Sequence, residues 1–191
     1  MYLIYETEAF VLESHGRREA DRVFSLYTKD FGMIRASAIA VRKMESKLRP
    51  HLVSSTLVNV SLVRGKDVWR LTAARRDGPL PDFKTPCGKA FVRASALVLR
   101  LVNGERVDLK LFSIMRSAYE ILADKSENDP LSFEIGLVLK ILHELGYVDP
   151  KDPFAEFLKS SEFSRETLSR FAPFARRAVS LVNDSIRESQ L

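Results

Sequence analysis

The sequence predicts an α+β fold, in which a five-stranded barrel at the N-terminus is followed by an all-α helical domain. Two observations predict it. Within residues 7–76, five short runs of apolar and β-branched residues are separated by polar turns, which is typical of a small all-β unit. After residue 81, apolar residues recur every three or four positions, which is typical of amphipathic helices.

The expected strands are short and closely spaced. Gly32 suits the turn that opens the third strand, and Ile34, Ala36 and Ala38 then alternate with other residues, as in a strand with one buried face. Residues 64–67 give a hairpin signal between the last two strands. Five strands with a long loop between the third and fourth predict an OB-fold barrel, and a β-sandwich fragment is the alternative. The expected strands are residues 9–12, 22–28, 33–41, 55–63 and 68–74.

The clearest domain boundary is residues 75–81, which contain two prolines and a glycine. The sequence therefore predicts an OB-fold domain over residues 1–80 and a helical domain over residues 81–191. Asp129 followed by Pro130, and later Ser164, are signals for helix starts. The expected helices are residues 89–102, 108–123, 130–145 and 153–158, one that begins after Ser164, and one over residues 173–189.

The net charge of +5 is unevenly distributed along the chain. Residues 1–80 hold 14 Lys and Arg against 9 Asp and Glu, whereas residues 81–191 hold 16 of each class. The excess of positive charge therefore lies in the predicted barrel, which indicates an acidic partner such as nucleic acid. We call residues 42–49 the basic loop, because it carries four cations against one acid; ordinary solvated charge is the alternative interpretation.

No catalytic or metal-binding constellation stands out in the sequence. It contains no G-x-x-x-x-G-K-[ST] phosphate loop, and its one cysteine and three histidines are too dispersed for a zinc site. We therefore expect a protein that is not an enzyme and that has no cofactor and no structural metal. The single cysteine fits a reducing cytoplasm, and neither a signal peptide nor a membrane span is expected.

Several short motifs follow one another along the first part of the chain. They are Ala9-Phe10-Val11-Leu12, Glu19-Ala20-Asp21-Arg22, Leu26-Tyr27-Thr28, Gly32, Val41-Arg42-Lys43 and Ser46-Lys47-Leu48-Arg49. In this order they resemble the opening of the RecO recombination mediators. Residues 133–150 resemble a later helix of the same family. The match is specific over residues 9–76 and less so over residues 131–150.

The sequence departs from the family pattern at two places. Ala40 stands where family members usually have a glycine, which bears on whether the turn there has a positive φ. Many members also carry a four-cysteine zinc site, but residues 151–162 contain no cysteine. The chain therefore resembles a short form of the family without the zinc module.

The resemblance implies a role in DNA repair and recombination. It implies binding to single- and double-stranded DNA and annealing of complementary strands. The implied partners are RecR, the single-strand-binding protein and, indirectly, RecA. The implied location is the cytoplasm, in association with the nucleoid.

Within this interpretation, cations of the predicted barrel bind phosphates, and an aromatic side chain stacks on a base. Trp69 is the preferred stacking residue among four aromatics of the barrel, and burial in the core is the alternative for each. The other three are Phe24, Tyr27 and Phe31. The candidate DNA-binding residues are Arg42, Lys43, Lys47, Arg49, Lys29, Arg35, Arg64, Lys66 and Trp69.

The helical domain offers a second candidate site. Arg170, Arg176 and Arg177 form a local basic cluster that suits an acidic peptide, such as the C-terminal tail of the single-strand-binding protein. Two other classes of function stay open. One is an OB-fold protein-interaction module with no direct DNA role. The other is an enzyme acting on nucleic acid, against which the missing metal ligands and carboxylate pair argue.

Overall fold

The computed structural model describes residues 3–17, 19–66, 68–124, 129–150, 153–160 and 162–188. The chain forms two compact units. The barrel unit combines residues 1–80 with 95–112, and the helical unit combines residues 81–94 with 113–191. The predicted division into domains of 1–80 and 81–191 stays a prediction. Among the described residues, no helix is both long and apolar enough to cross a bilayer.

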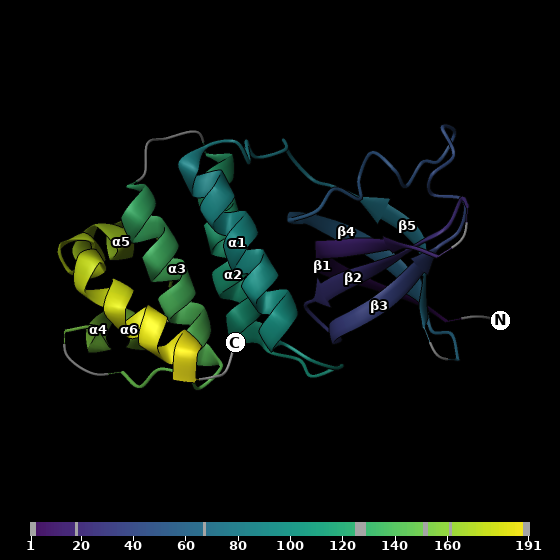
Figure 1. Cartoon of the computed structure of the whole chain (residues 1–191). Coiled ribbons are helices and arrows are strands. Elements are labelled where there is room, and N and C mark those ends of the chain that lie inside the picture. Colours follow the sequence, from purple (N-terminus) through teal and green to yellow (C-terminus); the bar gives the residue numbers. More distant parts are fainter. Residues whose placement is uncertain are drawn as a thin grey trace. The chain divides into compact units, whose positions relative to one another are not determined.

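The barrel unit contains a closed five-stranded barrel in which the strands lie in the order β1-β2-β3-β5-β4 (Figure 1). All neighbouring strands are antiparallel except β3 and β5, which are parallel. This is the topology of an OB-fold, so the predicted fold class is confirmed. The strands are β1 (Ile4–Gly16), β2 (Arg22–Thr28), β3 (Gly32–Ala38), β4 (Thr56–Val63) and β5 (Trp69–Arg75).

Strand β1 is much longer than the predicted residues 9–12. Its first half pairs with β4 and its second half with β2, and the register shifts between Val11 and Glu13. A strand that pairs with a different neighbour along each half must bend, and a shift in register of this kind allows the bend. The polar residues 13–16, predicted as a turn, therefore belong to the strand. Strand β3 is shorter than predicted and ends at Ala38, so residues 39–41 begin the loop.

The barrel interior is filled by inward-facing side chains from all five strands. Alternation holds in β3 and β4, where every second residue is buried. Hydrophobic burial of this kind contributes about 1.5–3 kcal/mol per large side chain. The fully or nearly buried members are Ala9, Val11, Phe24, Leu26, Ile34, Ala36, Ala38, Val41, Val58, Val60, Leu62, Trp69 and Leu71.

Residues 95–112 pack on the outside of the barrel. The Phe112 ring lies 5.5 Å from the ring of Phe10 and 5.8 Å from that of Tyr27. The Tyr27 hydroxyl donates a hydrogen bond to the carbonyl oxygen of Asp108 (3.1 Å), and the Met33 amide donates to that of Gly104 (3.1 Å). Tyr27 is therefore fixed in the core and does not face solvent.

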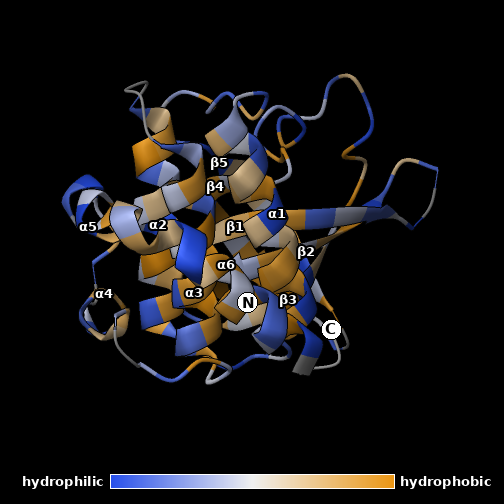
Figure 2. Ribbon diagram, turned by 60° about the vertical axis from the view of Figure 1, so that its left-hand side comes forward, coloured by the Kyte–Doolittle hydropathy of each residue, from blue (hydrophilic) through white to orange (hydrophobic). Residues whose placement is uncertain are grey.

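The helical unit is built around α3 (Pro130–Glu144), whose buried face includes Phe133, Leu137 and Ile141. Asp129 caps its start, as predicted, by accepting a hydrogen bond from the Ser132 amide (2.9 Å), and Pro130 occupies the first turn. Figure 2 shows the helices banded in orange and blue, as expected of helices with one apolar face. The other helices of the chain are α1 (Pro86–Leu101), α2 (Leu109–Ala123), α4 (Ala155–Lys159), α5 (Arg165–Phe171), the 3-10 turn η1 (Ala172–Phe174) and α6 (Ala175–Glu188).

The remaining helix signals agree with the structure where it can be compared. Ser164 caps α5 in a capping box with Thr167. The last helix begins in a 3-10 turn that contains Pro173, and α6 follows it. The helix predicted over residues 153–158 is observed as α4 (Ala155–Lys159), and the predicted end of the last helix at residue 189 lies outside the described residues.

Lys140 is a charged residue in the interior of the helical unit, where only 1% of it is exposed. Its ammonium donates hydrogen bonds to the carbonyl oxygens of Phe157 (2.7 Å) and Ser160 (2.6 Å) and lies 4.6 Å from the centre of the Phe157 ring. These bonds fix α4 and the residue after it to α3. Burial lowers the pKa of Lys140 to about 8, against the opposing effect of Glu144 and Glu162.

This lowered pKa predicts an unusual pH dependence of stability. Between about pH 8 and 10.5, unfolded Lys140 holds a proton that the folded residue has lost, so the free energy of unfolding rises with pH. The Lys140→Met variant lacks this rise. Urea denaturation of both proteins at pH 7.5, 8.5 and 9.5 measures the difference. Parallel pH profiles for the two proteins would contradict the assignment.

Candidate nucleic-acid interface

The basic loop leaves β3 through a turn that is tied to the β1–β2 connection. Ala40 has a φ of +53°, so the left-handed turn expected of a glycine is formed here by an alanine. Its amide donates a hydrogen bond to Oδ1 of Asp21 (2.8 Å). The Arg42 amide donates to the Ala20 carbonyl oxygen (3.1 Å), and its guanidinium donates to that of Glu19 (3.0 Å). Residues 19–21 and residues 40–42, which are separated in the sequence by β2 and β3, are therefore hydrogen-bonded to each other.

The strain at Ala40 predicts a stabilising substitution. A left-handed alanine costs about 1–2 kcal/mol, whereas a glycine costs about 0.5–1 kcal/mol through the greater freedom of the unfolded chain. We expect Ala40→Gly to raise the free energy of unfolding by about 0.5–1 kcal/mol and Ala40→Val to lower it. Chemical denaturation measures both. A less stable glycine variant would show that the methyl group makes a contact that outweighs the strain.

The far end of the basic loop is anchored by apolar side chains. Leu48 and Leu52 pack against the barrel core, and the amides of His51 and Leu52 donate hydrogen bonds to the Leu48 carbonyl oxygen. Between these anchors the side chains face solvent, and Met44 is 92% exposed. The four predicted cations of the loop are all exposed: Arg42, Lys43, Lys47 and Arg49. The two ends of the basic loop are therefore held against the barrel, and the cations between them are exposed to solvent.

Two of these loop cations also line a hollow of about 450 Å³ together with a residue of β2. We call this hollow the arginine pocket. Arg22, Arg42 and Arg49 supply its positive charge, and no acid is among its lining residues. Its apolar wall is formed by Phe24, Val41 and Leu52. An acid-free hollow with three guanidinium groups is a site for a phosphate or another small polyanion.

Arg22 was not among the candidate DNA-binding residues. It is the first residue of β2 and pairs with Ala38, the last residue of β3, so it lies where the basic loop begins. Its guanidinium donates a hydrogen bond to Oγ of Ser14 (3.0 Å). Pairing of β2 with β3 through a short turn was predictable, and counting back along that hairpin would have placed Arg22 beside the loop.

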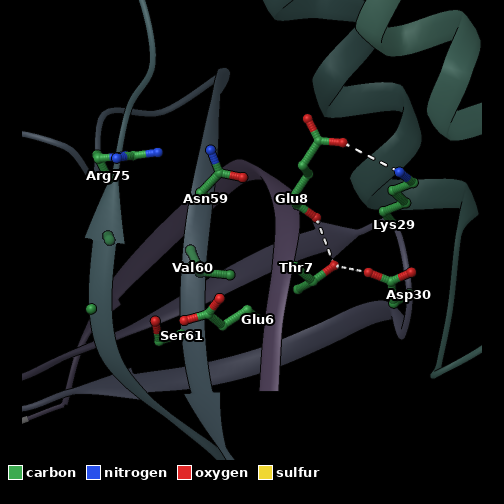
Figure 3. Close-up of a pocket in the computed structure, with 11 residues that line it drawn as sticks. Glu6, Thr7, Glu8, Lys29, Asp30, Asn59, Val60, Ser61 and Arg75 are labelled. Carbon is green, nitrogen blue, oxygen red and sulfur yellow. Dashed lines mark hydrogen bonds and ion pairs between the residues drawn. The ribbon is translucent and has the colours of Figure 1, made fainter. Parts of the chain in front are cut away.

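Lys29 lies in a different environment from the basic loop. It helps to line a hollow of about 590 Å³ that also contains Glu6, Glu8 and Asp30 (Figure 3). Its ammonium lies 3.6 Å from the Glu8 carboxylate, as the dashed line in Figure 3 shows. The hollow holds three acids against two cations, Lys29 and Arg75, which disfavours a phosphate there. None of the loop cations lines it, so the structure does not bring Lys29 together with them.

Arg64 is also engaged with an acid. Its guanidinium lies 2.8 Å from Glu105, and the indole of Trp69 donates a hydrogen bond to the other carboxylate oxygen (2.9 Å). The pKa of Glu105 is held below its usual value, chiefly by the bond from Trp69 and also by Arg64. Glu105 therefore stays ionised and offsets the charge of Arg64. Arg35 and Lys66 are exposed but do not line the arginine pocket.

The prediction that Trp69 stacks on a base is wrong for this structure. Trp69 is 3% exposed, because β5 points it into the barrel, where its ring lies 5.4 Å from Tyr5 and 5.0 Å from Phe31. Phe24 and Tyr27 are likewise buried, and Phe31 is half-buried within this cluster. None of the four candidate aromatics is an open platform for a base.

The three candidate arginines of the helical unit do not share one environment. Arg170 lies near the end of α5, forms an ion pair with Glu166 (2.5 Å) and lines an apolar hollow of about 100 Å³ with Phe157, Phe171 and Phe174. Arg176 and Arg177 are exposed in the first turn of α6. Apart from the stacking role of Trp69, the roles of the site residues predicted here and in the barrel stay predictions.

The closed barrel with its basic loop and the helices that follow it define an OB-fold protein of the α+β class. Comparison with known proteins shows which family of OB-fold proteins this chain resembles. Residues 1–76 match the family model described as "Recombination protein O N terminal". Residues 1–76 are therefore similar to the N-terminal domain of the RecO family, which confirms the resemblance seen in the sequence.

Three curated relatives extend the comparison, each named "DNA repair protein RecO". The protein of Dehalococcoides mccartyi is 39% identical over 139 residues, which are 70% of this chain and 54% of the relative. That of Nocardioides is 31% identical over 105 residues, covering 55% and 42% of the two chains. That of Rubrobacter xylanophilus is 26% identical over 154 residues, covering 80% and 62%. The chain thus spans about half the length of the curated relatives it matches.

Proposed function

We propose that this protein is a non-enzymatic DNA-binding protein of DNA repair and recombination. One observation carries the proposal: the basic loop and the arginine pocket gather five cations at one end of the barrel, namely Arg22, Arg42, Lys43, Lys47 and Arg49. Apart from Glu45, no acid lies within the loop, and none lines the pocket. The name of the relatives supports the same function.

The arrangement suits binding without sequence readout. Lysine and arginine side chains on a loop contact phosphates, which are the same for every sequence, whereas base edges are read by fixed polar groups in a groove. The aromatic residues that were candidates for stacking on bases are buried or half-buried, which leaves the backbone contacts to supply the affinity. We therefore expect similar affinity for oligonucleotides of different sequence.

The finer function that we propose is annealing of complementary single strands and assistance, with RecR, in loading RecA. It takes place in the cytoplasm at the nucleoid. Cations that neutralise phosphates lower the repulsion between two strands, which is the main electrostatic barrier to pairing. Annealing is measured with complementary oligonucleotides that carry a fluorophore and a quencher. The wild-type protein accelerates annealing, and a protein whose basic loop is neutralised does not.

We also propose that the helical unit binds the acidic C-terminal tail of the single-strand-binding protein. The hollow beside Arg170 combines three phenylalanines with one cation and one acid, Glu156. Arg170 is paired with Glu156 and Glu166, so an acidic group of the tail would replace these partners while an apolar side chain fills the hollow. Arg176 and Arg177 lie in the first turn of α6, where the helix dipole also favours negative charge. A protein-interaction module without DNA binding is the second candidate function, and this hollow is the observation that favours it.

One variant distinguishes the two candidate functions. Replacing Arg170, Arg176 and Arg177 by serine is expected to weaken binding of the acidic peptide about tenfold or more, because each lost ion pair at a partner surface removes some affinity. DNA affinity is expected to stay nearly unchanged. Fluorescence anisotropy with labelled peptide and labelled oligonucleotide measures both. Loss of DNA binding with intact peptide binding would mean that the two surfaces are assigned to the wrong units.

A further inference from the structure

The arginine pocket differs from the rest of the basic surface in being a hollow. Its three guanidinium groups come from separate segments: Arg22 opens β2, Arg42 follows β3, and Arg49 ends the basic loop. Among the described residues, none of the three forms an ion pair with a carboxylate. A volume of about 450 Å³ falls within the range of small-ligand pockets, roughly 300–1,000 Å³.

Two of the guanidinium groups are held in place before any ligand binds. Arg22 donates to Oγ of Ser14, and Arg42 donates to the carbonyl oxygen of Glu19. Both partners are uncharged, so the arginines keep their full charge for a ligand. The apolar wall of Phe24, Val41 and Leu52 excludes water on one side, which strengthens charge–charge interactions within the hollow.

We infer that the arginine pocket binds a phosphate monoester, and that it thereby recognises the phosphorylated end of a DNA strand. This inference rests on the proposed DNA binding and adds the part of the DNA that is preferred. A terminal phosphate carries a charge of about −1.5 to −2 and three strong acceptor oxygens, whereas a diester within the strand carries one charge. Three guanidinium groups therefore match a terminal phosphate better than an internal one.

The shape of the site supports the same preference. The DNA strand continues on both sides of an internal phosphate, so such a phosphate is more easily bound by an open surface, such as the exposed part of the basic loop. A terminal phosphate has the chain leaving on one side only and can enter a hollow. The loop cations Lys43 and Lys47, which do not line the pocket, then contact the phosphates that follow.

The test compares oligonucleotides of one sequence that carry a 5′-phosphate, a 3′-phosphate or no terminal phosphate. A phosphate at one of the ends is expected to raise the affinity of the wild-type protein about tenfold, as measured by fluorescence anisotropy. The Arg22→Gln and Arg49→Gln variants lose this preference: each binds the phosphorylated and the unphosphorylated strand with equal affinity, although both affinities fall because one cation is lost. Arg70→Gln is the matched control, because Arg70 is exposed on β5 and does not line the pocket.

Arg49 lies on the loop, so its variant keeps the test valid if Arg22→Gln fails to fold. Equal affinity of the wild-type protein for all three oligonucleotides would overturn the inference and leave the proposed function standing. Equal loss of the preference in Arg70→Gln would also overturn it, because the effect would then depend on net charge alone. Absence of binding to every oligonucleotide at low salt would instead refute the proposed DNA binding itself.

Discussion

Replacing Arg42, Lys43, Lys47 and Arg49 by alanine is expected to remove most of the affinity for single-stranded DNA. Each cation that neutralises a phosphate of a single strand contributes about 0.7 to the slope of log K against log salt. The quadruple variant is therefore expected to reduce that slope by roughly 2 to 3 units. Strand annealing falls with it, because a strand must be held before it can be paired.

Two controls distinguish a lost contact from a damaged fold or a lost net charge. Lys43, Lys47 and Arg49 are exposed on the loop, and each substitution changes stability by about 0.5 kcal/mol or less. Arg42 also bonds the Glu19 carbonyl oxygen, so its loss costs about 1 kcal/mol. The matched control replaces four exposed cations outside the loop, namely Lys84, Lys89, Arg100 and Lys159. An equal loss of slope in this control would contradict the role of the loop.

The largest expected effect on stability is at Gly32. Its φ is +67°, and a Cβ atom at this position would lie 2.3 Å from the carbonyl oxygen of Arg106. A left-handed alanine costs about 1–2 kcal/mol, and the overlap with a fixed backbone adds about 1–3 kcal/mol. Gly32→Ala is therefore expected to lower the free energy of unfolding by about 2–5 kcal/mol, as measured by chemical denaturation.

Gly104 separates the two contributions. Its φ is +75°, but nothing lies within 4 Å of the position of an added Cβ atom. Gly104→Ala therefore carries only the backbone cost, about 1–2 kcal/mol. The excess of Gly32→Ala over Gly104→Ala measures how tightly residues 103–106 close on the start of β3. Equal effects of the two substitutions would show that residues 103–106 move away to make room for the added methyl group.

Most elements could be predicted from the sequence because their signals are local. Strand β2 has the predicted limits, since a polar turn precedes it and the Lys29-Asp30 turn follows it. Asp129 and Ser164 were correctly predicted as helix caps, because a cap depends on residues three positions away. The OB-fold barrel could be predicted from the number of strands and from the position of the long loop.

Features that depend on distant pairing could not be predicted in the same way. Strand β1 extends over Glu6 and Glu8 because β4 pairs with it there, and those acidic residues do not look like a strand on their own. The indole of Trp69 points into the barrel, and its N–H keeps a hydrogen-bond partner there because Glu105, 36 residues away, accepts from it. The arginine pocket joins three segments through the register of the barrel, so no single stretch of sequence reveals it.

The same reasoning explains which site residues were found. The four cations of the basic loop are adjacent in sequence and exposed in the structure, so charge density alone was sufficient to select them. Charge density gives no information about partners, which is why Lys29 and Arg64 were selected although acids lie beside them. Arg22 was passed over because it stands alone in the sequence.

The central claim is that the cations at one end of the barrel bind DNA phosphates. The most direct measurement is the affinity of the wild-type protein for a single-stranded oligonucleotide across a series of salt concentrations. Contacts from the four cations of the basic loop and from Arg22 predict that log K falls with log salt with a slope of roughly −3 to −4. A slope near zero, or no binding at low salt, would contradict it.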